Sequence, residues 1–291
     1  MNILIIGGAG FIGSHIVDKL RTEHNVFVID NLSTGNLSNL NKEIKLYNFD
    51  ILDKNLEDIF KKEKPDIVIH LAAQISVAQS QCKPMQDALI NIMGTLNIIE
   101  LSKKYNIKKI IVASSAAIYG NLTSPIEENC VATPLSNYGI SKLSMEHYIK
   151  NSGLNYLILR FSNVYGERQN ADGEAGVITI FNNKMKQQES VYIHGDGEQV
   201  RDFIYVKDLA NIVNELIKRK ISNDIINIST GKGLSINELF TILKDKNNYN
   251  HSPIHDLARD GDIKISILDN KKLLSYLPNF EFTDIRKVFN V

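Results

Sequence analysis

The stretch Gly7-Gly8-Ala9-Gly10-Phe11-Ile12-Gly13 decides the fold, because it joins a short apolar run to an amphipathic segment. Residues 2–6 before it are apolar, as in a buried strand, and residues 11–23 after it have the apolar spacing of a helix. Glycines at such a junction permit a tight turn and close helix–strand packing, and the helix N-terminus offers its N–H groups to an anion. The stretch therefore predicts a strand–turn–helix unit that binds a pyrophosphate.

The same alternation continues through the first half of the chain. The expected strands are residues 2–6, 26–30, 44–49, 67–71, 109–114 and 156–161. The expected helices are residues 11–23, 56–62, 85–105 and 136–151. Apolar strands separated by helices are typical of an α/β fold with a Rossmann-like, doubly wound parallel sheet.

The alternation becomes less regular beyond Gly166. A polar loop is expected over residues 167–175 and a helix over 177–187, whereas 206–218 and 225–228 read as one more helix and strand of the main sheet. We therefore expect a dinucleotide-binding domain over residues 1–166, to which 203–229 returns. A smaller, interleaved substrate-binding domain is expected mainly over residues 167–291.

Two carboxylates follow strands beside the glycine turn. Asp30 ends the second predicted strand, 17 residues after Gly13. A carboxylate at this place can accept hydrogen bonds from the adenosine ribose hydroxyls and would repel a 2′-phosphate, so the sequence favours NAD over NADP as cofactor. Asp50 follows the third predicted strand, where it either reaches the adenine amino group or serves as a turn residue.

Tyr138 and Lys142 are the candidate acid–base pair. They lie four residues apart on the helix predicted over residues 136–151, so their side chains share one face. A free tyrosine has a pKa of about 10, and a cation held nearby lowers it. The pair can therefore act as a general base toward an alcohol, although the same spacing also arises by chance in helices.

Composition restricts the partners. The chain has 33 basic and 33 acidic side chains, hence a formal net charge of zero, and no basic tract or acidic tail. This argues against nucleic acid or a membrane surface as the main partner. The N-terminal apolar run lacks a basic n-region and is cut at Gly7, so neither a signal peptide nor a membrane span is expected. The two cysteines, Cys82 and Cys130, form no disulfide framework and indicate a reducing cytoplasm.

No metal site is predicted. His251 and His255 are four residues apart, but Pro253 interrupts a helix between them and no carboxylate or cysteine completes a ligand set. Both are expected to lie in loops, and His15 and His70 are expected to be core or cleft-wall residues.

Further motifs follow the glycine turn in order along the chain. They are Asp30-Asn31-Leu32-Ser33-Thr34-Gly35, Asp50-Ile51, His70-Leu71-Ala72-Ala73-Gln74, Asn91-Ile92-Met93-Gly94-Thr95, Ser114-Ser115-Ala116-Ala117-Ile118-Tyr119-Gly120, Tyr138 with Lys142, Arg160-Phe161-Ser162-Asn163-Val164-Tyr165-Gly166, Gly173-Glu174-Ala175-Gly176-Val177, Gly195-Asp196-Gly197, Arg201-Asp202-Phe203 and Arg259-Asp260-Gly261-Asp262. With these motifs the chain resembles, nearly end to end, the UDP-glucose (UDP-galactose) 4-epimerase group of the extended short-chain dehydrogenase/reductase superfamily.

The resemblance implies a role for each candidate residue. The NAD contacts would be Gly7, Gly10, Phe11, Ile12, Gly13, Asp30, Asn31, Ser33, Thr34, Gly35, Asp50, Ile51, Leu71, Ala72, Ala73, Asn91, Ser114, Tyr138, Lys142 and Phe161. Ser115 would bridge the sugar 4-hydroxyl and the Tyr138 phenol, Tyr138 would be the base, and Lys142 would bind the nicotinamide ribose.

The resemblance also implies a nucleotide-sugar site in the second domain. Its residues would be Ser115, Asn163, Val177, Tyr192, His194, Arg201, Arg259 and Ser266. Asn163, Arg201 and Arg259 would hold the diphosphate, which suits an amide and guanidinium groups. The alternatives are solvated surface charges for Arg201 and Arg259, and ordinary packing for Val177, Tyr192 and His194.

The activity implied is reversible C4 epimerisation of a UDP-hexose through a 4-keto intermediate with tightly bound NAD. Related dehydratases and decarboxylases carry a carboxylate where this chain has Ala116 and Ala117, so an elimination would lack its proton donor. Another enzyme of the superfamily remains the alternative. A non-catalytic NAD-binding sensor is a further one, which the presence of Ser115, Tyr138 and Lys142 disfavours.

Substrate range and assembly are two further expectations from the resemblance. Ser266 follows Arg259 by seven residues, where a small side chain leaves room for an N-acetyl group, and Ile75 forms another wall of the same space. UDP-N-acetylglucosamine and UDP-N-acetylgalactosamine are thus expected as substrates, unless Ser266 is merely an exposed residue before Asp269. Family members commonly pair through two helices per subunit, here 85–105 and 136–151, so a homodimer is expected. Such faces also pack within a subunit.

Overall fold

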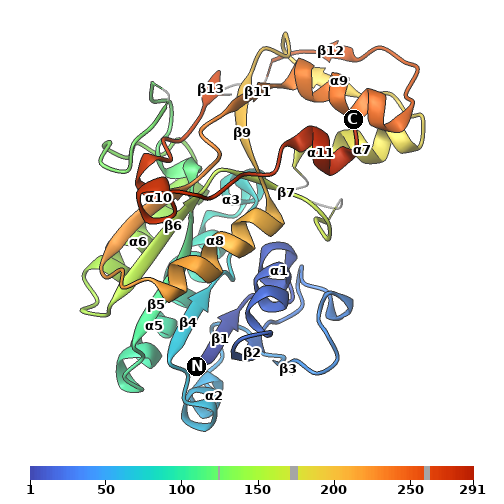
Figure 1. Cartoon of the computed structure of the whole chain (residues 1–291). Helices are drawn as coiled ribbons and strands as arrows, with labels where there is room; N and C mark the ends of the chain where they lie inside the picture. The colour runs from blue at the N-terminus through green and yellow to red at the C-terminus, as the bar shows by residue number, and fades with distance from the viewer. Residues whose placement is uncertain (124, 171–175, 259–262) are drawn as a thin grey trace.

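The computed structural model describes residues 1–123, 125–170, 176–258 and 263–291. Its centre is a seven-stranded parallel sheet with the order β10-β6-β5-β4-β1-β2-β3 (Figure 1). The strands are β1 (Asn2–Ile6), β2 (Asn25–Ile29), β3 (Lys45–Tyr47), β4 (Ile67–His70), β5 (Lys109–Ser115), β6 (Tyr156–Phe161) and β10 (Asp224–Ile228). The predicted doubly wound fold is confirmed, and the predicted strands differ from these only at their ends.

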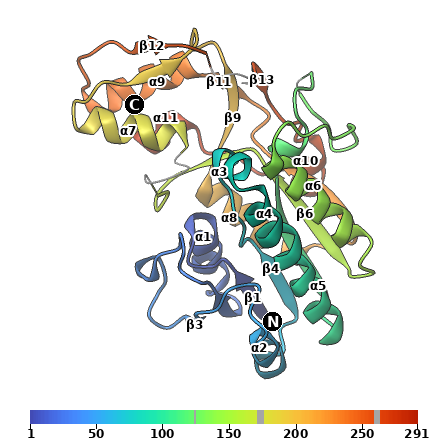
Figure 2. The same cartoon turned by 180° about the vertical axis from the view of Figure 1, so that it is seen from behind.

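Helices cover both faces of this sheet (Figures 1 and 2). On one face lie α1 (Phe11–Leu20) and α8 (Val206–Lys218), which pack on each other. On the other lie α2 (Leu56–Glu63), α5 (Thr95–Lys104) and α6 (Asn137–Lys150). Alternate strand residues feed the two cores: Ile3 and Ile5 face α1 and α8, and Leu4 and Ile6 face the opposite layer.

The helix predicted over residues 85–105 is a succession of three pieces. These are α4 (Pro84–Ala88), a π-helical turn η2 (Leu89–Gly94) and α5, preceded by the short α3 (Val77–Cys82). The Thr95 hydroxyl donates to the Asn91 carbonyl at 2.7 Å within this wider turn. Side chain to backbone bonds of this kind disturb regular helix, and π turns often occur at functional sites.

A smaller unit lies above the carboxyl edge of the sheet (Figure 1). Its strands are β7 (Asn163–Tyr165), β9 (Val200–Tyr205), β11 (Gly233–Ser235) and β13 (Ile265–Ser266), with β8 (Tyr192–His194) paired to β12 (Ile254–Asp256). Its helices are α7 (Val177–Lys186), α9 (Ile236–Asn247) and α11 (Ile285–Phe289), whereas α10 (Lys271–Tyr276) packs on β10 at the edge of the main sheet. Except for α7, these elements were not predicted. The strands are too short to carry an alternating pattern.

Two expectations for the C-terminal half need comment. The placement of His255 in a loop is wrong, because this residue lies in β12, paired with Ile193. In the segment predicted to return to the main sheet, residues 203–205 lie in β9 and pair with β7, whereas α8 and β10 pack with the main sheet. The domain division at residue 166 stays a prediction.

A buried ion pair fastens the carboxyl ends of the central strands to α6. Arg160 of β6 donates to both carboxylate oxygens of Glu146, at 2.9 and 2.7 Å. Ser114 also donates to this carboxylate at 2.6 Å, and Arg160 donates to the hydroxyl of Tyr119, the residue after the short helix η3 (Ala116–Ile118). Tyr119 in turn donates to Asn227 of β10 at 2.8 Å. One network thus joins β5, β6, β10 and α6.

We expect a Glu146→Gln substitution to destabilise the fold severely. It would leave the buried Arg160 guanidinium without its counter-charge, and removing one partner of a buried pair costs about 3–5 kcal/mol. Urea unfolding followed by far-ultraviolet circular dichroism measures the loss. The matched control is Glu57→Gln, which breaks the solvent-exposed pair with Lys104 (2.6 Å) and should leave the urea midpoint nearly unchanged. Equal midpoints for the two variants would contradict the expectation.

Candidate functional site

The glycine turn lies between β1 and α1 at the carboxyl edge of the sheet. Gly7 has φ +83°, and a Cβ there would come within 2.6 Å of the Ala72 nitrogen. A Cβ at Gly13 would meet the Gly7 carbonyl oxygen. Among the described residues no side chain caps α1 at Gly10, so the amides of its first turn, from Phe11 and Ile12 onward, can bind an anion. The turn therefore fits the pyrophosphate of a dinucleotide.

Asp30 holds this turn against the end of β2. Its Oδ2 accepts from the Ala9 N–H at 2.9 Å and its Oδ1 from the Leu32 N–H at 2.8 Å, and Gly35 lies beside the same carboxylate. Each carboxylate oxygen can accept a second hydrogen bond. Asp30 can thus fasten the turn and still receive ribose hydroxyls.

The next polar contacts lie where an adenine would follow the ribose. Asn31 donates to Asp50 Oδ2 at 2.7 Å, and the Ser33 N–H donates to Asn31 Oδ1 at 3.0 Å. Asp50 Oδ1 accepts from the Leu52 N–H, as expected of a turn residue. Thr34 lies in the same loop, and Ile51 packs against Gly94 of η2. The motifs around Asp30 and Asp50 are thus brought together.

The segment after β4 forms the facing wall of the cleft. The N–H groups of Leu71 and Ala72 both donate to the Ile6 carbonyl, at 2.8 and 3.0 Å, which brings Ala72 and Ala73 beside the glycine turn. The Asn91 side chain makes two hydrogen bonds with the Gln74 backbone. Its Oδ1 accepts from the Gln74 N–H at 2.8 Å, and its Nδ2 donates to the Gln74 carbonyl at 3.0 Å. Asn91 therefore fixes the shape of this wall.

His70 and His15 are buried, as predicted. His70 contacts the Thr95 hydroxyl at 3.0 Å, and burial followed by the nearby Lys142 charge lowers the pKa of His70 to about 3, so the ring stays neutral. His15 Nε2 lies 3.0 Å from the Glu167 carbonyl, and the neighbouring Asp18 pairs with Arg168 at 2.7 Å. These contacts tie α1, which carries the glycine turn, to the segment after β7.

Two predicted cofactor residues have side chains turned into the protein. The Ser114 hydroxyl is buried in its bond to Glu146, and Phe161 is buried in the core beneath α8. Ser114 and Phe161 can therefore contact a cofactor only through their backbone atoms, at the ends of β5 and β6.

Tyr138 and Lys142 lie in the first turns of α6. The Lys142 Nζ is 5.9 Å from the centre of the Tyr138 ring and donates to the Ala113 carbonyl of β5 at 2.9 Å. Burial lowers the pKa of Lys142 to about 8, a shift that the carboxylates of Asp87 and Glu146 oppose. The predicted arrangement of an ammonium beneath the phenol is therefore present.

The start of α6 is placed by three local contacts. The Ser136 hydroxyl caps the helix by accepting from the Gly139 N–H at 3.1 Å, and the Tyr138 N–H donates to Ser80 of α3 at 3.1 Å. A Cβ at Gly139 would lie 2.5 Å from the Ala117 carbonyl oxygen, so glycine allows the helix to rest on η3. As a result, the first turn of α6, which contains Tyr138, lies beside η3 and the end of β5.

Ser115 is the last residue of β5 and caps η3. Its Oγ accepts from the Ala117 N–H at 3.1 Å, which leaves the hydroxyl hydrogen to donate to another acceptor. Ala116 and Ala117 bring no acid–base group to this turn. The edge of the sheet thus carries one hydroxyl, one phenol and one ammonium group.

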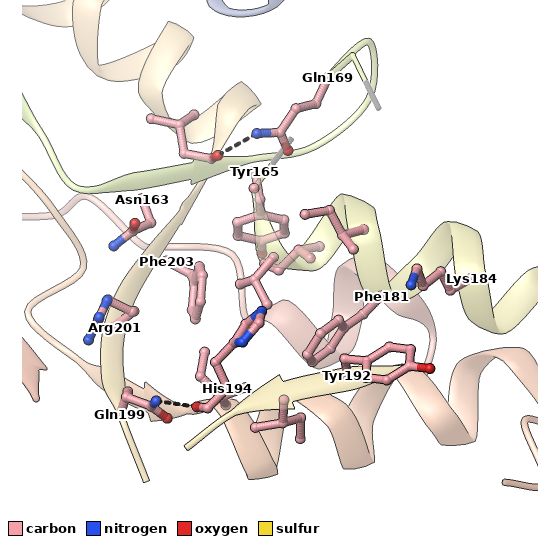
Figure 3. Close-up of a pocket in the computed structure, with 17 residues that line it drawn as sticks. Asn163, Tyr165, Gln169, Phe181, Lys184, Tyr192, His194, Gln199, Arg201 and Phe203 are labelled. Carbon is pink, nitrogen blue, oxygen red and sulfur yellow. Dashed lines mark hydrogen bonds between the residues drawn. The ribbon is translucent and has the colours of Figure 1, made fainter. Parts of the chain in front are cut away.

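A pocket of about 480 Å³ in the smaller unit contains most of the predicted substrate residues (Figure 3). Its lining includes Asn163, Val177, Tyr192, His194 and Arg201. Figure 3 shows Asn163 and Arg201 together at one end and Phe181, Lys184 and Tyr192 at the other. A guanidinium and an amide at one end and aromatic rings at the other suit a nucleoside diphosphate.

Strand pairing brings the polar end together. Asn163 pairs with Phe203 across β7 and β9, so the side chain of Arg201, two residues earlier on β9, lies on the same face of the sheet as Phe203. Asn163 Nδ2 donates to the Asp202 carbonyl at 3.1 Å, and Arg201 Nη1 donates to the Val200 carbonyl at 2.9 Å.

Sequence reasoning missed several lining residues of the pocket. They include Gln169, Phe181, Lys184, Gln199 and Phe203. Val177, Phe181 and Lys184 follow helical spacing on α7, so the periodicity of the predicted helix could have found the latter two. The Lys184 Nζ lies 5.1 Å from the centre of the Tyr192 ring, a cation–π contact that pairs α7 with β8.

Ser266 lies beside the polar end of the pocket. In the ladder of β13 and β9 it pairs directly with Arg201. It is half-buried and is not among the residues that line the pocket itself. Arg259 and residues 171–175, which carry parts of two predicted motifs, lie outside the described residues. Ile75, predicted as a second wall, is exposed.

Other classes of site were also considered. Within the described ranges, no three His, Cys, Asp or Glu side chains gather in a way that could hold a metal ion. None of the helices in these ranges is both long and apolar enough to cross a membrane. Cys82 and Cys130 are exposed thiols, and a cytoplasmic location stays a prediction.

Comparison with known proteins agrees with this arrangement. The sequence profile of the NAD dependent epimerase/dehydratase family matches residues 3–229. A putative UDP-glucose 4-epimerase of Methanocaldococcus jannaschii is 46% identical over 99% of this chain and 97% of its own length.

Two solved structures are similar over almost the whole chain. A UDP-glucose 4-epimerase from Thermotoga maritima with UDP-glucose is 44% identical, with a TM-score of 0.94 over 99% of this chain and 96% of that one. A UDP-N-acetylglucosamine 4-epimerase from Methanobrevibacter ruminantium, in complex with UDP-N-acetylmuramic acid, is 38% identical, with a TM-score of 0.92 over 99% and 94%. The chain therefore belongs to the NAD dependent epimerase/dehydratase family, and within it to the UDP-glucose 4-epimerase group, with NAD as its cofactor.

Proposed function

We propose that this protein catalyses the reversible C4 epimerisation of a UDP-hexose through a 4-keto intermediate. The observation that carries the proposal is the position of Tyr138, above Lys142 and beside the strand that ends in Ser115. This pair lies at the sheet edge that also carries the glycine turn, and the pocket for a nucleoside diphosphate lies in the adjoining unit. The similarity to UDP-glucose 4-epimerases along the whole chain supports it.

The glycine turn, Asp30 and the wall from Leu71 to Ala73 would hold the dinucleotide. When bound, NAD supplies the acceptor and donor of the hydride at C4 of the sugar. The Tyr138 phenolate removes the 4-hydroxyl proton through the Ser115 hydroxyl and returns it after the sugar has turned. The Lys142 ammonium favours the phenolate form and can donate to the ribose hydroxyls of the nicotinamide.

The diphosphate anchors explain how a ketone could be kept during the turn. Asn163 and Arg201 hold the phosphates at one end of the pocket, while Tyr192 and Phe181 are available to the base at the other. A nucleotide held at both ends leaves the hexose free to rotate about its phosphate linkage. Both faces of C4 can then be presented to the same reacting groups.

Elimination of water or carbon dioxide is the rival chemistry at such a site. It needs a carboxylic acid or carboxylate beside the sugar ring, and the turn that follows Ser115 offers the methyl groups of Ala116 and Ala117 instead. With NAD as the hydride acceptor and donor, epimerisation needs no acid–base group beyond the hydroxyl, phenol and ammonium that are present.

We further propose that N-acetylated substrates are accepted. Ser266 pairs with Arg201 in the β13–β9 ladder, so its side chain lies next to the diphosphate end, where the hexose begins. A hydroxymethyl side chain leaves space that a ring would fill. The UDP-N-acetylglucosamine 4-epimerase that is 38% identical to this chain supports the proposal.

Finally, we propose a homodimer that pairs through α4, η2 and α6. Met85, Leu89 and Met93 are four residues apart and exposed to 87%, 48% and 52%, and Ile140 and Tyr148 are exposed on the adjacent α6. These helices lie side by side on the face seen in Figure 2. Such a row of apolar side chains is typical of a helix seam with a second copy.

The function is tested by incubating the purified protein with UDP-glucose, UDP-galactose and their two N-acetylated analogues, without added reductant. Interconversion of the 4-epimers to equilibrium is expected. CDP- and dTDP-hexoses are the controls for the nucleotide. Release of a dehydrated or decarboxylated sugar, or no turnover of any UDP-hexose, would contradict the proposal.

A Tyr138→Phe variant should lose about 10²–10⁴-fold in kcat, because it removes the acid–base oxygen with little change of shape. Bound NAD, measured by absorbance after denaturation, should be unchanged. The matched control is Tyr156→Phe, at the start of β6 and away from the carboxyl edge of the sheet, which should keep full activity. Near-normal turnover by Tyr138→Phe would show that another group is the base.

A Ser266→Tyr variant should lose the N-acetylated pair first, because the ring occupies space beside the sugar. The ratio of kcat/KM for UDP-N-acetylglucosamine to that for UDP-glucose measures the effect. Ile265→Tyr places the same ring on the opposite face of β13 and should leave the ratio unchanged. If wild-type turnover of the acetylated pair were already below about a hundredth of that of the plain pair, the proposed range would be wrong.

The dimer is tested by sedimentation of a Met85→Glu, Met93→Glu double variant. Burying like charges in a seam opposes association, so the wild type should sediment as a dimer and the variant as a monomer. Leu37→Glu, at another exposed apolar residue, should remain dimeric. A monomeric wild type, or a dimeric double variant, would exclude this seam.

A further inference from the structure

The ammonium of Lys142 has two buried carboxylates in its neighbourhood. Asp87 of α4 is 1% exposed, Lys142 is 3% exposed and Glu146 is fully buried. Glu146 has its own counter-charge, because Arg160 donates to both of its oxygens. No ion pair within the described residues involves Asp87, so the cation that compensates this carboxylate has to be a neighbour at longer range.

The side-chain contacts of Asp87 are with uncharged groups, and one of these groups also contacts α6, the helix that carries Lys142. Its Oδ1 accepts from Gln74 Nε2 at 2.8 Å and from Asn91 Nδ2 at 3.1 Å. The same Asn91 nitrogen lies 3.0 Å from the hydroxyl of Ser141, the residue before Lys142. Two side chains therefore connect the carboxylate on α4 to the turn of α6 that carries the ammonium.

We propose that Asp87 is a positioning residue that holds Lys142 in its cationic form beneath Tyr138. A buried carboxylate with only amide donors is costly unless a positive charge lies close, and the buried ammonium has the reciprocal need. The proposal rests on the proposed function, because it explains how the base of that mechanism keeps its neighbouring cation.

The charges around Lys142 fix the sign of the effect. Burial lowers its pKa to about 8, and the groups that oppose this shift are Asp87, from α4, followed by Glu146, from its own helix. His70, on β4, is neutral, and Arg160, on β6, is engaged by Glu146. Removing the Asp87 charge must therefore lower the pKa of Lys142 further, so that the ammonium loses its proton at a lower pH.

The test compares Asp87→Asn with the wild type as NAD-bound enzyme. The alkaline limb of the kcat–pH profile should move to lower pH, so that the ratio of kcat at about pH 8.5 to kcat at about pH 7 falls at least about threefold. Independently of turnover, NMR titration of carbon-13-labelled lysine should show a lower midpoint for the Lys142 ε-carbon. That signal is assigned by its loss in Lys142→Arg.

Three further variants separate charge from packing. Glu100→Gln removes an exposed carboxylate from the neighbouring α5 and should change neither the alkaline limb of the kcat–pH profile nor the Lys142 titration midpoint. Ser141→Ala breaks the hydrogen bond between Asn91 and α6 and should likewise change neither quantity. Asp87→Ser removes the charge without introducing an amide and should reproduce the displacement, which keeps the test valid if Asp87→Asn disturbs the packing.

An unchanged Lys142 midpoint and alkaline limb in a folded Asp87 variant would overturn the inference. The inference would also be overturned if Ser141→Ala moved the Lys142 midpoint as far as Asp87→Asn does. The hydrogen bond through Asn91 and Ser141, and not the charge of Asp87, would then be responsible. Failure of the proposed function has a different signature, which is full activity of Tyr138→Phe.

Discussion

The buried pair of Glu146 and Arg160 is the interaction on which the site depends. It joins α6 to β6 beneath the sheet edge, and Ser114 and Tyr119 extend it to β5 and η3. Charges this deep are tolerated only when all their hydrogen bonds are made in one geometry. The strand that ends in Ser115 and the helix that carries Lys142 are therefore held in a single arrangement, as the roles proposed for this hydroxyl and this ammonium require.

A buried carboxylate also lies at each of the two proposed ligand sites. Asp30 fastens the glycine turn through Oδ2 and the loop after β2 through Oδ1, and each oxygen keeps a lone pair for a ribose. Asp202 is buried beside Arg201 and accepts from Thr230 and Gly231 at the end of β10, and burial raises the pKa of Asp202 to about 6. Because side chains alternate along β9, fixing Asp202 inward directs Arg201 toward the pocket. In both places a buried carboxylate aligns a group that we propose to bind the ligand.

The helix before α5 has two faces with different tasks. Asp87 and Asn91 turn inward toward α6, whereas Met85, Leu89 and Met93 turn outward in an apolar row. Asn91, Leu89 and Met93 all belong to the π turn, and Asp87 and Met85 belong to α4. In the proposed dimer, the outward row packs against the second copy. The helix α4, which carries Asp87, would then be packed on both faces, against α6 and against the partner.

Local patterns in the sequence determined the parallel sheet, the glycine turn with Asp30, and Tyr138 with Lys142 on one helix face. Each of these depends on residues within one or two elements, through the strand period, the helix period and the chemistry of glycine. The tertiary structure alone decided the pocket, the pairing of Ser266 with Arg201 and the approach of Asp87 to Lys142. Those depend on pairing between β7, β9 and β13 and on the packing of α4 against α6, where the contacting residues are far apart in the chain and too few to leave a periodic pattern. The fold and the local placement of the candidate residues could thus be predicted from the sequence, and the tertiary environment of those residues could not.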